Sequence, residues 1–340
     1  MKAVRVEQFG GPDVLRVAEL PAPEPRDDEV VIELEAAGVN RLDVLVRSGG
    51  YHRGGQPPLV PGVEGSGVIR QVGSAVTGFA AGDRVLAFGG RPGFYAEYVA
   101  VSGRRVVRRP EGLDPAAAAA LPTAWLSAWY CLRHLARPGP GQRVLVYAAA
   151  SGVGDAAVQV AKHLGAEVIA VAGSDDKLAW TLANGADHAI NHARQDVLAA
   201  TMALTDGEGV EVVLDAVGGR TFAEALKTAG HGGRVVCLAN VALESSRVDT
   251  RDFYPKNLAI YGFQVTNLIE RGGYDPRGDL EELADLAAQG HLNVHVDQVF
   301  PLEHAAEAHR YLEARRNRGK VILEPNPRGV QTAGWVLDDG

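Results

Sequence analysis

The chain has 340 residues, more than one ordinary hydrophobic core holds, and this length suits two domains. Its 46% hydrophobic and 22% charged residues are typical of a soluble globular protein and exclude a disordered, collagenous or membrane-spanning chain. Acidic residues outnumber Lys and Arg by 42 to 34, and the net charge of -8 argues against nucleic acid or an anionic membrane surface as a partner.

The first third of the chain predicts a mainly β, barrel-like domain. Short alternating or apolar segments are separated there by clusters of Gly, Pro and Asp, which are turn residues. These segments are residues 2–9, 14–20, 29–39, 65–73, 83–88 and 95–101. An alanine-rich segment, residues 115–120, closes this part of the chain.

From residue 122 the pattern changes to strands that alternate with amphipathic helices. The predicted strands are 143–147, 167–171, 188–192, 210–217, 233–239 and 258–263, and the predicted helices are 153–164, 175–183, 196–204 and 221–228. Parallel strands joined by helices form a doubly wound α/β sheet. Gly165, Gly185 and Gly230 each follow a periodic segment, so we expect left-handed glycine caps at these helix ends.

The C-terminal part predicts a return to the first domain. A polar loop is followed by a helix at 280–289, an apolar run at 294–300, a helix at 303–315 and a strand at 320–324. We therefore assign residues 1–121 and 264–325 to one domain and 122–263 to the other. Residues 326–340 have no periodicity and are expected to form a flexible tail.

The two cysteines, Cys131 and Cys237, are too few for a disulfide framework. Both lie in apolar runs, as reduced and packed thiols do. The N-terminus is not followed by a long apolar segment. We expect a cytoplasmic protein.

Residues 144–162 read VLVYAAASGVGDAAVQVAK, and their context is that of a dinucleotide-binding loop between a strand and a helix. Ala149 and Ser151 stand where the usual pattern has its first two glycines. Ala149, Ser151, Gly152 and Gly154 are all small enough to let backbone amides approach a pyrophosphate, and Ser151 adds a hydroxyl donor. The alternative is a tight turn without a ligand.

The end of the second strand of this domain favours NADPH over NADH. An NAD-binding domain usually has an acid there, roughly 20 residues after the glycine loop, to bind the ribose diol. Here Gly173 and Ser174 leave room for a 2′-phosphate, and Lys177 can reach it. The alternative is a solvated Lys177, since the adjacent Asp175 and Asp176 would repel a phosphate.

Seven ordered segments resemble one protein family over residues 2–325. They are GGPDVL (10–15), GVNRLDVLVRSGGY (38–51), PGVEGSGVIRQVG (61–73), AGDRV (81–85), AAASGVGDAAVQVAK (148–162), GADHAINH (185–192) and GKVILEP (319–325). This pattern resembles the quinone oxidoreductase branch of the medium-chain dehydrogenase/reductase family, the zinc-independent branch that includes ζ-crystallin. The resemblance implies a GroES-like β-barrel catalytic domain built from both chain ends, a Rossmann domain between them, and an active site in the cleft.

The resemblance also predicts that no metal is bound. Zinc-dependent relatives have ligands at three positions that read Asn40, Val63 and a residue near Ala119 here. The segment that would hold a structural zinc, residues 85–95, is short and has no cysteine, and the histidines form no cluster with ligand spacing.

Without a Lewis acid an alcohol is hard to oxidise, so we predict hydride transfer to a conjugated acceptor such as a quinone or an α,β-unsaturated carbonyl. Asn40 is a candidate donor to a substrate oxygen or to the nicotinamide ribose, and the alternative is that it satisfies a turn. Tyr51 is a candidate donor to the developing oxyanion, and the alternative is an aromatic ring that only covers the cleft. Asp43 and Arg47 have the spacing of a helical ion pair.

The cofactor-binding residues implied by the resemblance come from both domains. They are Asn40, Thr123, Ser151, Gly152, Val153, Gly173, Ser174, Lys177, His192, Leu238, Ala239, Asn240 and Arg315. His192 stands where relatives often have tyrosine. A histidine at this position makes the affinity for the cofactor more dependent on pH. Arg315 would reach the cofactor from the C-terminal segment, and a solvated helix arginine is the alternative.

The predicted function is that of an NADPH-dependent quinone oxidoreductase that acts without a metal. The alternatives are an alkenal, enone or enoyl-thioester reductase, and an NADPH-binding structural or RNA-associated protein with little turnover. The apolar segment 258–263, at the expected edge of the sheet, can pair with a copy of itself. A homodimer is expected, with a tetramer as the alternative.

Overall fold

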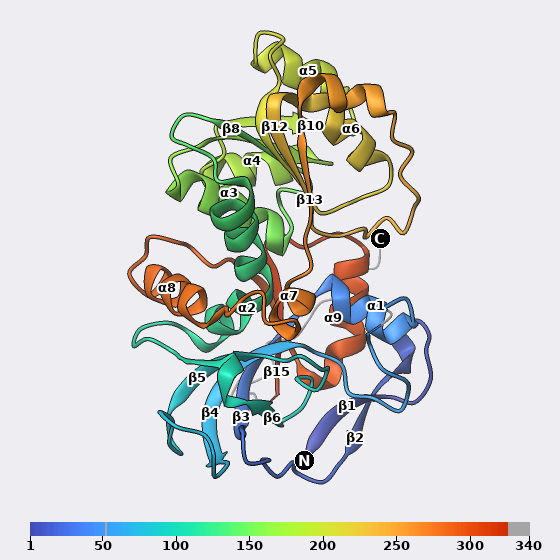
Figure 1. Cartoon of the computed structure of the whole chain (residues 1–340). Helices are drawn as coiled ribbons and strands as arrows, with labels where there is room; N and C mark the ends of the chain where they lie inside the picture. Colours follow the sequence, from blue (N-terminus) through green and yellow to red (C-terminus); the bar gives the residue numbers. More distant parts are fainter. Residues whose placement is uncertain (52, 326–340) are drawn as a thin grey trace.

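The computed structural model describes residues 1–51 and 53–325, so the predicted flexible tail lies outside the described residues. Figure 1 shows two lobes, with the middle of the chain in the upper lobe and the N-terminal strands together with β15 (Lys320–Glu324) in the lower lobe. The short helix α7 (Val265–Glu270) lies between them.

The lower lobe is a β structure completed by the C-terminal segment. Its elements are β1 (Lys2–Val6), β2 (Leu15–Glu19), β3 (Glu29–Val39), α1 (Arg41–Ser48), β4 (Glu64–Val72), β5 (Arg84–Phe88), β6 (Tyr98–Ser102), β7 (Val106–Arg108), β14 (Val296–Pro301), α9 (Ala305–Glu313) and β15 (Lys320–Glu324). The main sheet has the order β14-β15-β3-β4-β5-β7, and β6 pairs with β3. Because β15 pairs antiparallel with β3, the predicted return of the chain to its first domain is confirmed.

The upper lobe is a parallel sheet with helices on both faces. Its elements are β8 (Arg143–Val146), α3 (Gly152–His163), β9 (Glu167–Ala172), α4 (Asp175–Ala183), β10 (His188–Asn191), α5 (Val197–Leu204), β11 (Val210–Asp215), α6 (Arg220–Thr228), β12 (Ala229–Cys237) and β13 (Ala259–Gly262). The strand order is β10-β9-β8-β11-β12-β13.

Alternate residues of β8 show how both faces of this sheet are covered. Val144 and Val146 share a core with residues of α3, whereas Leu145 shares a core with residues of α5 and α6 on the other face. The predicted doubly wound fold is therefore confirmed.

Two of the three expected glycine caps are present. Gly165 and Gly185 have φ values of 82° and 107° and cap helices as expected, but Gly230 lies inside β12 and caps no helix.

Helix α2 (Pro115–Trp129) runs through the predicted domain limit at 121/122, and α8 (Arg277–Ala288) follows α7. The domain limits stay a prediction.

No helix within residues 1–51 and 53–325 has the length and apolar character that crossing a membrane requires.

Candidate functional site

A fully buried carboxylate, that of Glu64 at the start of β4, links segments of the chain that lie far apart in the sequence. Its Oε1 accepts from Asn40 Nδ2 at 2.7 Å and from Lys320 Nζ at 2.6 Å, and its Oε2 accepts from the Thr123 backbone N–H at 2.6 Å. Lys320 Nζ also donates to Asn40 Oδ1 at 2.7 Å. We call these four residues the Glu64 cluster, and it brings the predicted site residues Asn40 and Thr123 together.

Pro122 explains why the Thr123 amide is available to Glu64. Proline inside a helix has no N–H and its ring crowds the preceding turn, which disturbs the local hydrogen-bond ladder of α2. The next amide, that of Thr123, donates out of the helix to the carboxylate.

The Glu64 cluster limits the hydrogen bonds that the Asn40 side chain can make to a ligand. Its carbonyl oxygen accepts from Lys320 and one of its two amide hydrogens goes to Glu64, so one N–H is left for a ligand. Sequence reasoning missed Glu64 and Lys320, although an acid inside an apolar segment and a lysine at the start of a buried strand are visible signals.

The predicted phosphate loop opens α3 as expected. Ser151 is the N-cap residue, and its Oγ accepts from the Gly154 N–H at 3.1 Å. A Cβ at Gly154 would lie 2.2 Å from the Ala148 carbonyl oxygen, so only glycine permits this close packing of helix on strand. The helix N-terminus, with Gly152 and Val153 in its first turn, supplies a partial positive charge.

The C-terminal segment lies against this loop. The Gly319 N–H donates to the Ala150 carbonyl at 3.0 Å, and a Cβ at Gly152 would lie 2.7 Å from Lys320 Cδ. The Glu64 cluster and the phosphate loop are therefore adjacent.

The residues predicted to bind a 2′-phosphate meet at the end of β9. Lys177 Nζ donates to the Arg315 carbonyl at 2.5 Å, and Ser174 Oγ donates to Asp176 Oδ1 at 2.5 Å. A Cβ at Gly173 would lie 3.0 Å from His192 Nε2, so the glycine makes room for the histidine ring.

Arg318 joins this group and was missed in the sequence. Burial lowers the pKa of Lys177; Asp176 and Asp297 oppose this effect, while the charges of Arg318 and Arg315 add to it. The cations Lys177, Arg315 and Arg318 thus concentrate positive charge where an acid for the ribose diol would otherwise stand.

A pocket between the lower lobe and α7, the helix that lies between the lobes, contains Tyr51 and Thr123. We call it the inter-lobe pocket; it has a volume of about 60 Å³ and is lined largely by apolar side chains, among them Leu42, Val46, Val63, Phe88 and Leu126. Tyr51 Oη accepts from Gln264 Nε2 at 3.2 Å. Burial raises the pKa of Tyr51, so its phenol keeps its proton at neutral pH.

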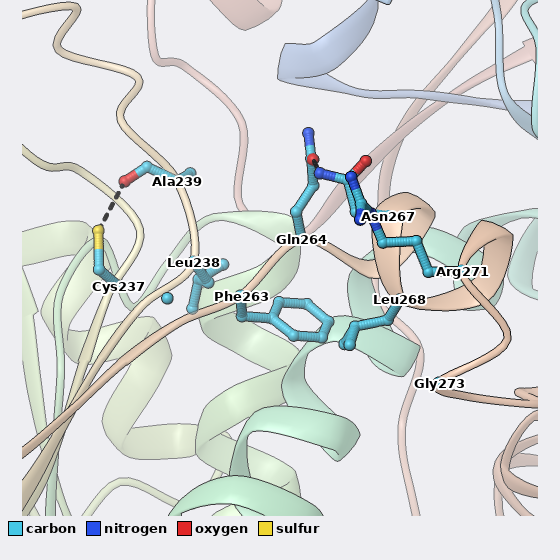
Figure 2. Close-up of a pocket in the computed structure, with 10 residues that line it drawn as sticks. Cys237, Leu238, Ala239, Phe263, Gln264, Asn267, Leu268, Arg271 and Gly273 are labelled. Carbon is cyan, nitrogen blue, oxygen red and sulfur yellow. Dashed lines mark hydrogen bonds between the residues drawn. The ribbon is translucent and has the colours of Figure 1, made fainter.

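Helix α7 separates the inter-lobe pocket from a second, wider cavity of about 550 Å³. Figure 2 shows Leu238 and Ala239 in this cavity with Phe263, Gln264 and Leu268. Val265, Thr266 and Ile269 of the same helical segment line the inter-lobe pocket instead. Leu238 and Ala239 thus line a cavity, as expected for residues that would contact the nicotinamide half of the cofactor.

Asn240 lies outside the lining of both cavities. Its Nδ2 donates to the Glu244 carbonyl at 3.0 Å, and a Cβ at Gly218 would lie 2.6 Å from its Oδ1. Its role toward the cofactor stays a prediction.

The predicted ion pair of Asp43 with Arg47 is wrong. Arg47 pairs with Glu313 of α9 at 2.7 Å, because α9 packs against α1 and supplies a closer carboxylate. Asp43 instead accepts from the Asn40 N–H at 2.8 Å and from Tyr95 Oη at 3.1 Å. Tyr95 Oη lies 3.0 Å from His309 Nε2.

We expect Asp43→Asn to remove a pH dependence of stability. Burial raises the pKa of Asp43 from 3.8 to about 7, so the stability it contributes is complete below its unfolded pKa and is lost as the pH rises through about 7. Denaturant unfolding between pH 4 and pH 7 should show that the free energy of unfolding of the wild type falls by about 1.4 kcal/mol per pH unit relative to that of the variant.

Burial lowers the pKa of His309 to about 3, which gives an opposite slope, but this contribution is common to both proteins and cancels in the difference. The exposed Asp285→Asn change is the control, because it replaces a carboxylate that is not buried. A constant difference between wild type and Asp43→Asn from pH 4 to pH 7 would contradict the prediction.

The three positions of the absent zinc ligands carry no metal-binding side chains. Val63 and Ala119 are apolar, and the Asn40 amide binds Glu64 and Lys320. Across residues 1–51 and 53–325, no group of three or more His, Cys, Asp or Glu side chains is placed to hold a metal ion. The absence of a metal from the working protein stays a prediction.

Comparison with known proteins places the chain in a family. Residues 26–111 match the model of the alcohol dehydrogenase GroES-like domain, and residues 184–323 match that of zinc-binding dehydrogenases. The quinone oxidoreductase of Rattus norvegicus is 32% identical over 325 residues, which are 95% of this chain and 97% of the relative.

Solved structures agree with this assignment. An Escherichia coli quinone oxidoreductase complexed with NADPH matches with a TM-score of 0.89 and 30% identity, over 96% of this chain and 100% of that one. An NAD-dependent alcohol dehydrogenase matches with a TM-score of 0.87 and 36% identity, over the same shares. The chain belongs to the medium-chain dehydrogenase/reductase family, in the branch of the quinone oxidoreductases.

Proposed function

We propose that the protein is an NADPH-dependent quinone oxidoreductase that transfers hydride to a quinone without a metal. The observation that carries the proposal is the group of Lys177, Arg315 and Arg318 at the end of β9, where Gly173 and Ser174 stand in place of the usual strand-end acid. The relatives named quinone oxidoreductase support the choice of acceptor.

Residues of both lobes fit the cofactor. The amides at the N-terminus of α3 would hold the pyrophosphate, Lys177 and Arg315 the 2′-phosphate, and Thr123 with Leu238 and Ala239 the nicotinamide side. When bound, NADPH supplies the hydride.

The inter-lobe pocket would receive the acceptor. Its apolar lining excludes water, the Tyr51 phenol donates to the oxygen that gains charge, and the remaining Asn40 N–H is a second donor. A volume of about 60 Å³ is small for a quinone, and α7 lies between this pocket and the cavity lined by Leu238 and Ala239, so hydride transfer requires α7 to move when cofactor and acceptor bind.

The test is NADPH oxidation by purified protein with ortho- and para-quinones, enones, alkenals and enoyl thioesters. Fastest turnover with quinones supports the proposal, and fastest turnover with enones or enoyl thioesters makes the protein a reductase of that class. Tight NADPH binding without oxidation by any acceptor would make it a cofactor-binding protein.

Tyr51→Phe should lower kcat by at least about tenfold and leave the KM for NADPH unchanged, because it removes a donor to the developing oxyanion. Steady-state kinetics measure this. Tyr98→Phe, which removes a phenol bound to Glu33 on the lower sheet, is the matched control and should keep full activity. An unchanged kcat with a raised KM for quinone would mean that the ring only covers the cleft.

We also propose a homodimer formed through β13. Within the described part of the chain β13 pairs with β12 alone, which leaves its other edge open, and Ile260 is 40% exposed there. Ile260→Arg should convert dimers to monomers in sedimentation velocity, whereas Val299→Arg on β14 should not. A monomeric wild type at micromolar concentration would contradict this.

The net charge of -8 supports a protein that binds neither nucleic acid nor an anionic membrane. The free thiols of Cys131 and Cys237 support a reducing, cytoplasmic location, which cell fractionation tests.

A further inference from the structure

Arg105 brings an unusual charge into the inter-lobe pocket. It ends the short 3-10 turn η2 (Gly103–Arg105) and lines the pocket together with Tyr51 and Thr123. Its guanidinium lies 5.7 Å from the centre of the Phe88 ring. Gly90 makes room for it, because a Cβ there would lie 2.7 Å from both terminal nitrogens.

Within the described part of the chain Arg105 has no counter-charge, unlike three other buried or half-buried arginines of the lower lobe. Arg47 pairs with Glu313, Arg109 with Glu35, and Arg53 with Glu270. Among the described residues Arg105 has no carboxylate or carbonyl partner; burial alone lowers its pKa, and no neighbouring charge offsets this. A half-buried cation without a partner costs stability, which a ligand of opposite charge would recover.

The second arginine of the pocket does not supply this charge. Arg53 is neutralised by Glu270 and is also bound to Asn267 of α7. Among the described residues that line the inter-lobe pocket, Arg105 therefore carries the one uncompensated positive charge, in a protein whose overall charge is negative.

We propose that Arg105 is a specificity residue and that the acceptor carries a carboxylate. This inference rests on the proposed function. A guanidinium presents parallel N–H donors to a planar carboxylate, and that of Arg105 lies beside the Phe88 ring in the pocket. The carboxylate takes no part in the reaction: hydride from NADPH and a proton from solvent reduce the quinone to a hydroquinone and leave NADP⁺.

The experiment compares a naphthoquinone that carries a carboxylate on its benzo ring with the methyl ester of the same compound, which is neutral. In the wild type, kcat/KM should be at least about tenfold higher for the carboxylate. In Arg105→Gln this ratio should fall to about one, and Arg105→Lys should restore part of it. Using a ratio cancels any general loss of activity. The exposed neighbour change Arg104→Gln is the control and should keep the wild-type ratio.

A binding measurement separates this inference from the proposed function. Naphthalene-2-carboxylate and naphthalene-2-carboxamide, which cannot be reduced, are titrated into protein with NADP⁺ by calorimetry. Tighter binding of the carboxylate that is lost in Arg105→Gln supports the inference even if no quinone is turned over, a result that would end the proposed function. Quinone turnover with a wild-type ratio near one, or a ratio that Arg105→Gln leaves unchanged, overturns the inference and leaves the proposed function standing.

Discussion

Replacing Lys320 by Met is expected to lower the free energy of unfolding by about 3–5 kcal/mol. The Glu64 side chain is 0% exposed and that of Lys320 4%, so the substitution leaves the Glu64 carboxylate in the interior without its ammonium partner. Asn40 also loses the donor to its carbonyl oxygen. Urea unfolding monitored by the fluorescence of the buried Trp125 and Trp129 measures the effect.

The control for this prediction is the double change Glu64→Gln with Lys320→Met. It removes both charges, leaves a neutral amide side chain near Asn40 and Thr123, and should recover most of the lost stability. A single Lys320→Met variant as stable as the wild type would show that Glu64 does not rely on this ion pair.

Lys177→Ala is expected to lower kcat/KM for NADPH by roughly 10- to 100-fold while changing that for NADH little. The reason is that a charge-assisted hydrogen bond contributes about 1.5–3 kcal/mol and only the phosphorylated coenzyme has the partner for it. Parallel steady-state kinetics with the two coenzymes measure the ratio. Lys162→Ala, which breaks an ion pair with Asp187 at the surface, is the control.

Cofactor choice is where the relatives disagree, which makes this prediction informative. One similar structure is described as NAD-dependent and another is complexed with NADPH. A wild type that prefers NADH, or a Lys177→Ala variant that loses both coenzymes equally, would contradict the role given to Lys177, Arg315 and Arg318.

Local patterns in the sequence were enough to predict the two lobes and the strand-to-helix loop before α3. The α4 helix was predicted with the bounds that the structure has, because its apolar period and acidic first turn are contained in a single segment. The loop before α3 was predicted despite Ala149 and Ser151, since small residues between a buried strand and an amphipathic helix are a local signal.

What escaped prediction depends on contacts between distant segments. Lys320 lies 256 positions from Glu64, and their pairing requires β15 to return beside β3. Arg47 looked paired with Asp43 because α9, which supplies Glu313, is not visible from α1 alone. Gly230 looked like a helix cap, but parallel pairing with β11 extends β12 back over it.

The central claim is hydride transfer from NADPH to a quinone without a bound metal. It is tested most directly by measuring turnover of chelator-treated protein whose metal content has been determined, with a quinone as acceptor and, separately, with primary and secondary alcohols as donors. We predict full quinone reduction with NADPH at substoichiometric zinc and no oxidation of alcohols. Stoichiometric zinc whose removal abolishes turnover, together with oxidation of simple alcohols by the unphosphorylated coenzyme, would contradict it.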